Sequence, residues 1–353
     1  MSYFKLEPQY RYTLKSMPRG KNSHIKNSCN VPYRALTIDF KSNCLICTCD
    51  GWLPIPVGKV QDFNSLAEVW SSPIAQTLQA DIDNKKYTWC AVEHCGIKQH
   101  NIVRDSYELA INIDESCNLH CPSCRRNPIM HTSGPEFDNK LNDLHRIIQW
   151  LDNFDEPICI ILSGNGDPLA SAIIRPLINS YQPKTTQTFR LFTNGLLIKK
   201  QLIDSKILPN VSNFLISVDA GSSAVYANVR RGGNWQILLE NFDFLDSIGV
   251  NDKVQLNFAV QKNNFRDLEN FVAVCQKYGF IANIHQLDDW GTWATTMPVN
   301  PDAWTIVNGT FEQHNVLSTS HPDYKECVNI LQKIATYPGR IKFSNNLVTR
   351  MSA

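Results

Sequence analysis

The sequence predicts an α/β fold whose parallel sheet is either open and doubly wound or an incomplete barrel. After Tyr107, short apolar segments alternate with amphipathic segments of helix length. Most of the apolar segments are rich in Ile, Leu, Val and Phe, as strands covered on both faces are. Polar and glycine-rich residues follow these segments, where parallel strands carry their ligand-binding loops.

Six strands are predicted, and helices are predicted between most of them, which favours right-handed crossovers. The strands cover residues 108–114, 158–164, 188–195, 213–220, 253–261 and 280–287. The helices cover residues 139–154, 171–182, 234–249 and 265–279. After about residue 300, a helix over 321–335 and a last strand over 340–346 complete the prediction.

Residues 1–107 have a different character. They contain several turn signals and only one predicted helix, over residues 65–82. Ser65 is the expected N-cap of this helix, with Glu68 completing a capping box. Because the segment has little apolar periodicity, we expect it to need a metal for its stability.

The composition excludes several classes of protein. A length of 353 residues allows two domains, or one large domain with an appendage. The net charge of +1 gives no reason to expect nucleic acid or an acidic membrane as partner. No apolar run approaches the roughly 18–20 residues that span a bilayer. The N-terminus lacks the apolar core of a signal peptide, so the predicted location is the cytoplasm.

The chain has 12 cysteines, which in a reducing compartment indicate metal binding or catalysis rather than disulfides. Cys159, Cys275 and Cys327 are isolated and are expected to be small buried hydrophobic residues. Cys117, Cys121 and Cys124 are spaced C-x3-C-x2-C directly after the first predicted strand. Three thiolates can hold three irons of a [4Fe–4S] cubane and leave one iron open to a small molecule. A zinc site closed by a distant fourth ligand is the alternative.

This spacing, and the loops that follow it, resemble the radical S-adenosylmethionine (SAM) superfamily. The similar segments follow in the expected order: "SGNGDP" (163–168), "TNG" (193–195), "ISVDA" (216–220), "VRRGGNWQILLENFDFL" (229–245), "FAVQKNN" (258–264) and "DDWGTW" (288–293). Two positions depart from the family pattern. Ser123 stands where an aromatic residue often lies near the adenine, and Asp167 stands where the family has Glu.

The resemblance implies a partial (β/α)6 barrel of the TIM type over residues 105–300, followed by a helix and strand extension over 301–353. It also implies a [4Fe–4S] cluster with an open site and SAM as its ligand. An electron donor such as flavodoxin or ferredoxin would reduce the cluster. SAM would then be cleaved to a 5′-deoxyadenosyl radical that abstracts hydrogen from the substrate, while the protein positions the reactants and excludes water.

Matching positions assign SAM contacts to individual residues. Gly164, Gly166 and Asp167 are expected to line the amino end of the methionine moiety. Ser217 and Asp219 are expected to reach other polar groups of SAM. Asn194 and Gln261 either do the same or hold their own loops. Arg230 or Arg231 would neutralise the SAM carboxylate, unless the pair is solvated.

Residues 1–104 resemble the SPASM or twitch domains that bind an auxiliary iron–sulfur cluster. In most relatives such a domain follows the barrel, whereas here it precedes it. The implied ligands of a second [4Fe–4S] cluster are Cys29, Cys47, Cys90 and Cys95, with Cys49 as an alternative to Cys47. Cys44 is expected in the core, and a zinc knuckle is the alternative reading of the same residues.

The predicted function is modification of a peptide or protein side chain by hydrogen abstraction. A dehydrogenase or epimerase acting on a carbohydrate or other small metabolite is the alternative, and a non-catalytic iron–sulfur or zinc scaffold is a third hypothesis. Cys275 and Cys327 are candidate hydrogen donors to a substrate radical. His285 and Asp288 are candidates for contact with the substrate at the rim of the barrel.

Overall fold

The computed structural model describes residues 25–47, 56–90, 92, 95–124, 128–163, 166–287 and 311–351. Cys49, Gly164 and Asp288 lie outside these residues. The chain divides into two compact units. Unit 1 comprises Met1–Glu115, His131–Asn165 and Ile173–Phe189, and unit 2 comprises Ser116–Met130, Gly166–Ala172 and Arg190–Ala353.

In unit 1, strands of the front segment join the same sheet as the first predicted core strand. The strand order is β3-β2-β1-β4-β5. β1 runs parallel to β4, which runs parallel to β5, whereas β1–β2 and β2–β3 are antiparallel. The strands are β1 (Ala35–Ile38), β2 (Asn43–Leu45), β3 (Gly58–Lys59), β4 (Tyr107–Ile111) and β5 (Ile158–Leu162). The helices are α2 (Val31–Arg34), α3 (Leu66–Ser71), α4 (Pro73–Asp83), α5 (Pro135–Asp152) and α6 (Arg175–Asn179), with short 3-10 turns η1 (Val60–Asp62) and η2 (Gly96–Lys98).

The single helix predicted over residues 65–82 is two helices, α3 and α4. The break falls before Pro73, whose ring nitrogen has no hydrogen to donate and is tolerated only in a first helical turn. Ser72 caps the second helix by accepting from Ala75 N (3.4 Å). Ser65 caps α3 as expected, accepting from Glu68 N (3.2 Å). The Glu68 carboxylate accepts from Asn64 N (2.7 Å) rather than from Ser65, so the predicted capping box is incomplete.

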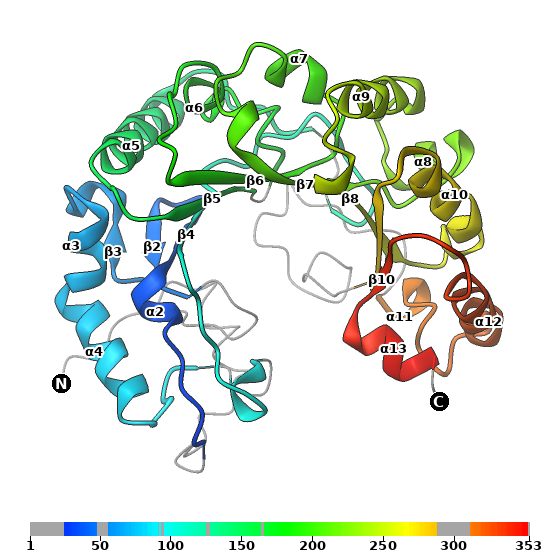
Figure 1. The fold of residues 1–353 in the computed structure, drawn as a ribbon, viewed down its shortest axis with the longest axis horizontal. Helices are drawn as coiled ribbons and strands as arrows, with labels where there is room; N and C mark the ends of the chain where they lie inside the picture. Colours follow the sequence, from blue (N-terminus) through cyan, green and yellow to red (C-terminus); the bar gives the residue numbers. More distant parts are fainter. Residues whose placement is uncertain are drawn as a thin grey trace. The chain divides into compact units, whose positions relative to one another are not determined.

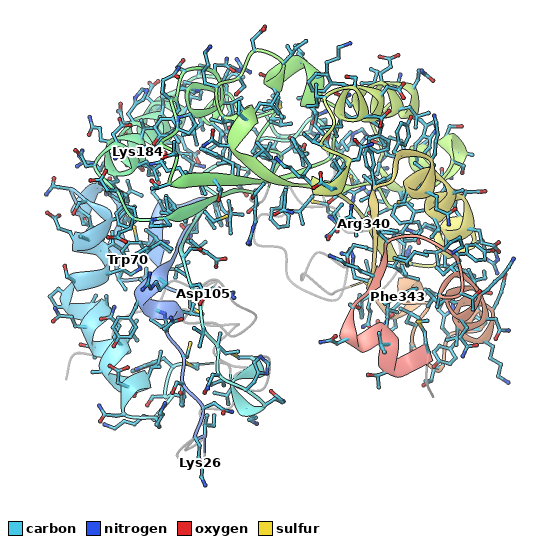
Figure 2. The ribbon with its side chains drawn as sticks, in the orientation of Figure 1. Lys26, Trp70, Asp105, Lys184, Arg340 and Phe343 are labelled. Carbon is cyan, nitrogen blue, oxygen red and sulfur yellow. The ribbon has the colours of Figure 1, made fainter. Side chains whose placement is uncertain are left out.

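Trp70 of α3 fixes this helix in unit 1 (Figure 2). Its indole nitrogen donates to Ala35 O (3.2 Å), and its ring centroid lies 5.0 Å from that of Tyr107. Trp70 therefore joins α3 to two neighbouring strands, β1 and β4.

In unit 2, four strands run parallel in the order β7-β8-β9-β10. They are β7 (Val211–Ser217), β8 (Val254–Val260), β9 (Ile281–Gln286) and β10 (Ile341–Phe343), and β6 (Gln187–Thr193) contains the boundary between the units. The helices are α7 (Ile198–Leu202), α8 (Ser223–Val229), α9 (Trp235–Ser247), α10 (Leu268–Tyr278), α11 (Phe311–His314), α12 (Tyr324–Ile334) and α13 (Asn345–Met351), with 3-10 turns η3 (Leu208–Asn210), η4 (Asn251–Lys253) and η5 (Phe265–Asp267).

The sheet of unit 2 has two unlike faces. Along β8, the fully buried Leu256 and Phe258 alternate with the half-buried Asn257 and Ala259. The ring centroids of Phe258 and of Phe271 in α10 are 4.9 Å apart, so the apolar face lies under α10 (Figure 1). The opposite face carries the half-buried residues.

The sequence prediction of an α/β fold with a mainly parallel sheet is confirmed. All six predicted core strands are present, as β4 to β9, and each is one or two residues shorter than predicted. The predicted boundaries at 104/105 and 300/301 fall inside unit 1 and unit 2, respectively, and stay predictions. Within the described residues, no helix has the length and apolar character that crossing a bilayer requires.

Candidate functional site

The three cysteines lie in a folded loop of unit 2. Cys117 N donates to Ile129 O (2.7 Å), and Cys124 N donates to Cys121 O (2.9 Å). His120 N donates to Arg231 O (3.1 Å), which joins this loop to the segment after α8. Cys121 is buried, with 8% of its surface exposed, whereas Cys117 and Cys124 are half-buried. The loop thus holds one buried thiol and two more accessible ones.

Two N–H groups from distant parts of the chain face these thiols. Asn194 Nδ2 lies 3.9 Å from Cys117 Sγ and donates to Asn118 Oδ1 (2.9 Å). Arg230 Nη1 lies 3.9 Å from Cys121 Sγ. Burial raises the pKa of Cys121, and the Arg230 guanidinium opposes that shift by favouring the thiolate. The two N–H groups therefore favour anionic sulfur, against the effect of burial at Cys121.

Arg230 is held by a buried ion pair with Asp219. Arg230 Nη2 lies 2.7 Å from Asp219 Oδ2, while Asp219 Oδ1 accepts from Ala259 N (2.7 Å). Burial alone would lower the pKa of Arg230, but the charges of Asp219 and Cys121 raise it, so the guanidinium stays charged. Asp219 lies in the loop that follows β7 and has a left-handed backbone conformation, with φ of 56°. Two of the predicted SAM contacts are thus partners of one another.

Asp167 joins three segments of unit 2. Its carboxylate is buried and accepts from Thr193 Oγ1 (2.9 Å), Asn194 N (2.6 Å) and Leu169 N (2.9 Å). Its backbone N–H donates to Ser116 O (2.7 Å), next to the first cysteine. Burial raises the pKa of Asp167, and the hydrogen bonds from Asn194 and Thr193 counteract this. The predicted contact of Asp167 with the methionine moiety of SAM stays a prediction.

Three buried polar atoms near the cysteine loop have no hydrogen-bond partner in the described part of the chain: Tyr226 Oη, Arg230 Nε and His120 Nδ1. Gly232 and Gly233 have no side chain to fill the space beside two of these atoms. A Cβ on Gly233 would lie 2.9 Å from Tyr226 Oη, and a Cβ on Gly232, where φ is 89°, would lie 3.0 Å from His120 Nδ1. Because unpaired buried donors cost free energy, such atoms indicate a place for a ligand.

Three of the remaining predicted SAM contacts lie at the end of a strand or in the segment after one, whereas Arg231 follows α8. Ser217 is the last residue of β7 and pairs across the sheet with Asn257. Gln261 follows β8, is buried, and its backbone N–H donates to Asn264 Oδ1 (2.8 Å). Gly166 directly precedes Asp167. Arg231 Nε donates to His120 O (3.2 Å), so Arg230 rather than Arg231 is the arginine beside a cysteine thiol.

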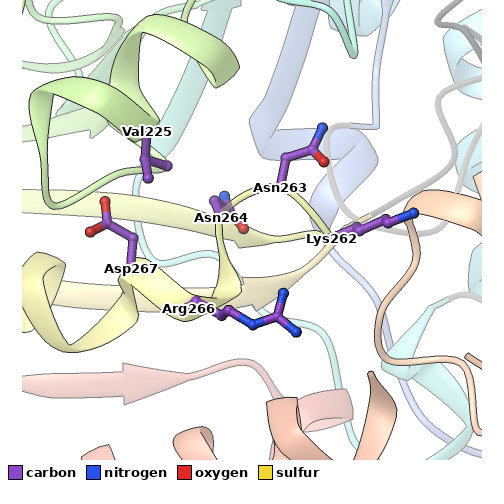
Figure 3. Close-up of a pocket in the computed structure, with 6 residues that line it drawn as sticks. All are labelled: Val225, Lys262, Asn263, Asn264, Arg266 and Asp267. Atoms are coloured by element: carbon purple, nitrogen blue, oxygen red, sulfur yellow. The ribbon is translucent and has the colours of Figure 1, made fainter. Parts of the chain in front are cut away.

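A pocket of about 190 Å³ opens beside the loop after β8 (Figure 3). Side chains of α8 and of the segment from β8 to α10 line it, namely Val225, Lys262, Asn263, Asn264, Arg266 and Asp267. Asp267 is buried and accepts from Gly221 N (2.6 Å) and Ser222 Oγ (3.0 Å). Asn264 Nδ2 donates to Asp219 O (3.0 Å), which links the wall of this pocket to the ion pair.

Three of the predicted auxiliary ligands, Cys29, Cys90 and Cys95, share a neighbourhood in unit 1. Burial, and then the charges of these three cysteines, raise the pKa of Tyr87 to about 12. Burial also raises the pKa of Cys29, and Cys95 adds to that shift. Tyr87 has a left-handed backbone, with φ of 49°, a conformation that costs free energy in a bulky residue.

The other front cysteines differ in position. Cys47 is half-buried and follows β2, and its role as a ligand stays a prediction. Cys44 is fully buried in β2, as expected for a core residue. Among the described residues, no three His, Cys, Asp or Glu side chains form a cage for a single metal ion.

The candidate catalytic residues have unlike surroundings. Cys275 of α10 and Cys327 of α12 are buried, and burial raises the pKa of both thiols, that of Cys327 to about 12. His285 lies on β9, where its Nδ1 is buried without a partner among the described residues. Their catalytic roles, like that of Asp288, stay predictions.

Sequence reasoning missed four residues of this site: Asn118, Tyr226, Asn264 and His120. Asn118 and His120 stand between the cysteines of the motif, and Asn264 ends the quoted "FAVQKNN" segment, so a signal was present for them. Tyr226 offered none, because a single tyrosine in a helical segment reads as a packing residue.

Residues 111–275 match the sequence model of the Radical SAM superfamily. This segment of the chain therefore carries a radical SAM domain. This class implies a [4Fe–4S] cluster and SAM. The residues present fit such a group, because Cys117, Cys121 and Cys124 share one loop, N–H groups of Asn194 and Arg230 face two of the thiols, and unpaired buried polar atoms lie nearby.

Two curated proteins are similar to this chain. The AdoMet-dependent heme synthase of Nitratidesulfovibrio vulgaris is 26% identical over 176 residues, which cover 49% of this chain and 46% of that protein. A probable GTP 3',8-cyclase of Methanococcus aeolicus is 25% identical over 194 residues, covering 52% and 60%, respectively. The matched part thus spans less than two thirds of either relative.

Solved structures give weaker similarities. anSMEcpe with bound AdoMet has a TM-score of 0.42 at 16% identity, covering 67% of this chain and 61% of that one. A mutant of spore photoproduct lyase has a TM-score of 0.40 at 13% identity, covering 78% and 96%. TM-scores of this size support no conclusion about the present chain.

We predict that Asp167→Asn lowers the free energy of unfolding by about 2–3 kcal/mol, the cost of mispairing a buried group. The amide would direct its NH2 group at an N–H donor that the carboxylate now accepts. Urea unfolding followed by circular dichroism measures the change. Asp204→Asn, at an exposed carboxylate of the same unit, is the control. Equal stability of Asp167→Asn and the wild type would contradict the role of the Asp167 carboxyl group as the acceptor of these hydrogen bonds.

Proposed function

We propose that Cys117, Cys121 and Cys124 hold a [4Fe–4S] cluster at which SAM is cleaved reductively, and that the chain modifies a peptide or protein side chain by hydrogen abstraction. The observation that carries this proposal is the three-cysteine loop with N–H donors 3.9 Å from two of its sulfurs. Once reduced by the electron donor, such a cluster would supply one electron to SAM, whose C–S bond would break to give methionine and a 5′-deoxyadenosyl radical.

The protein's own groups prepare this chemistry. The Arg230 guanidinium and the Asn194 amide stabilise anionic sulfur at Cys121 and Cys117, and Asp219 keeps Arg230 in place. The unpaired Tyr226 Oη and Arg230 Nε are two buried donors that suit the SAM carboxylate, because a guanidinium and a hydroxyl both donate to carboxylate oxygens. Burial of this region limits the access of water to a reactive radical.

The front segment supports a second cluster. Cys29, Cys90 and Cys95 neighbour one tyrosine, and Cys47 or Cys49 would supply a fourth thiolate. A domain of this kind is associated with enzymes that modify peptides, which favours a peptide or protein substrate. Flavodoxin or ferredoxin is the proposed electron donor.

A small metabolite is the second candidate substrate, because the two curated relatives are named as a heme synthase and a GTP cyclase. Anaerobic incubation with SAM and reductant, followed by mass spectrometry of candidate peptides and of small-molecule extracts, separates the two. A mass change confined to the small molecules would contradict the peptide proposal.

The cysteine loop is tested by replacing Cys117, Cys121 and Cys124 together with Ala. We expect reconstituted protein to lose 5′-deoxyadenosine formation, since no protein ligands remain for the cluster. Cys159→Ala, which removes a buried thiol of β5, is the control and should retain the product. Continued formation of 5′-deoxyadenosine by the triple variant would contradict the assignment.

Tyr226→Phe is expected to weaken SAM binding about tenfold, because a hydrogen bond to a charged group contributes about 1.5–3 kcal/mol. Its stability should not fall, since the lost hydroxyl is unpaired. Tyr181→Phe is the opposite control: its hydroxyl donates to Gln187 (2.7 Å), so stability should fall while SAM affinity is retained. Equilibrium dialysis and urea unfolding measure both quantities. Wild-type affinity in Tyr226→Phe would remove this residue from the site.

The auxiliary cluster is tested by iron content. Wild-type protein reconstituted without oxygen should hold about eight irons, from two cubanes. The double variant Cys90→Ala and Cys95→Ala should hold about four, because one cluster loses two ligands. Cys44→Ala, at a core thiol nearby in sequence, should keep the wild-type content. An unchanged iron content in the double variant would contradict the assignment of Cys90 and Cys95 as cluster ligands. Zinc in place of iron would favour the zinc knuckle.

A further inference from the structure

The sheet face away from α10 carries a row of amide side chains. Gln255 and Asn257 of β8 are half-buried and alternate with the apolar residues that α10 covers. On β9, Asn283 and His285 are half-buried in the same way. In a parallel sheet, residues paired across strands share a face, so the register decides which of them lie together.

The register sets this row beside the site described above. Ser217, Asn257 and Asn283 are successive partners across β7, β8 and β9. Two residues further along, Ala259 pairs with His285, and Ala259 N donates to Asp219 (2.7 Å). The amide row therefore begins next to Ser217. Asn257 in this row is two residues along β8 from Ala259, whose backbone N–H donates to Asp219 of the ion pair.

The amides are ordered by one another and keep part of their hydrogen-bonding capacity. Asn257 Oδ1 accepts from both Gln255 Nε2 and Asn283 Nδ2, each at 2.9 Å. Asn257 therefore has its Nδ2 group left to donate, while Gln255 Oε1 and Asn283 Oδ1 are left to accept. These three atoms have no hydrogen-bond partner among the described residues. His285 Nδ1 is buried and also has no partner there.

The residues of this face on β7, β8 and β9 carry no fixed charge. On β7 they are Asn213, Leu215 and Ser217, and on the other two strands they are the amides, Ala259 and His285. A carboxylate or an ammonium group bound here would be desolvated without a counter-charge on the face, at a cost of free energy. A neutral group with both a donor and an acceptor would satisfy the free amide atoms.

We propose that Gln255, Asn257, Asn283 and His285 form the substrate-recognition face and that they bind a neutral group which both donates and accepts hydrogen bonds. An amide and a hydroxyl share this chemistry. The inference rests on the proposed function, because it places the substrate beside the site where SAM is expected.

The test uses acetamide, acetate and acetamidinium, three probes of one shape. Acetamide is neutral and has both kinds of group, acetate only accepts, and acetamidinium is a cation that only donates. Saturation-transfer NMR of the reconstituted full chain measures their binding. We expect acetamide to bind at least about fivefold more tightly than either ion, which corresponds to one hydrogen bond of about 1 kcal/mol.

Asn257→Asp provides the decisive variant, because it keeps the shape and the accepting oxygen and adds a negative charge. Its preference should shift from acetamide to acetamidinium. Gln276→Leu, at an exposed amide of α10, is the control and should bind all three probes as the wild type does. A wild type that binds none of the probes, or that prefers acetate, overturns the inference, as does an Asn257→Asp variant with unchanged preference.

A second experiment distinguishes an amide from a hydroxyl as the group that this face binds. Ethylene glycol offers the same neutral donors and acceptors as hydroxyls. Binding of acetamide over the diol indicates an amide group in the substrate, and the reverse indicates a hydroxyl; both support the recognition face. Formation of 5′-deoxyadenosine by the wild type without substrate is measured in parallel. If that product forms but neither neutral probe binds, this inference fails while the proposed function stands.

Discussion

The buried ion pair between Asp219 and Arg230 is the interaction on which the rest of the site depends. Burying two charges costs free energy, and additional hydrogen bonds to the charged groups offset part of that cost. Here Asp219 also accepts from the backbone of β8, and Arg230 faces the sulfur of Cys121. The pair thus holds a positive charge beside a thiol that would otherwise be buried without one.

Aspartates connect neighbouring loops of unit 2 in a recurring way. Asp167 accepts from the backbone of Asn194, Asp219 from that of Ala259, and Asp267 from that of Gly221. Each carboxylate follows a strand, and each N–H belongs to an adjacent loop or strand end. Because a carboxylate has several acceptor positions, one side chain can position two segments. The loops that surround the cysteines are therefore held by charge-assisted hydrogen bonds rather than by apolar packing alone.

The two faces of the sheet in unit 2 have different tasks. The apolar face packs on α10, and aromatic pairs such as Phe258 with Phe271 stabilise it. The opposite face carries the amides of Gln255, Asn257 and Asn283, which hydrogen-bond to one another. A sheet with one covered and one polar face supports both a stable core and an adjacent ligand surface. The curated relatives are near 25% identical and are matched over less than two thirds of their length, so they do not define the molecule on which this chain acts.

The sequence by itself determined the features that depend on local spacing. These are the cysteine triplet, the alternation of strands and helices, and the polar loops after the strands. It did not reveal that β1 would pair with β4, because strand pairing between distant segments leaves no local pattern. It also missed the helix break, where Pro73 interrupted an otherwise regular apolar period.

Only the tertiary structure decided which residues surround the thiols. Arg230 and Cys121 are 109 residues apart in the chain, and Asn194 is 77 residues from Cys117. Tyr226 gained its significance from an unpaired hydroxyl and from the missing side chain of Gly233. Hydrogen bonds act over a few ångströms in space, whatever the separation along the chain, so a linear pattern records the ligands of a site but not the groups that fold against them.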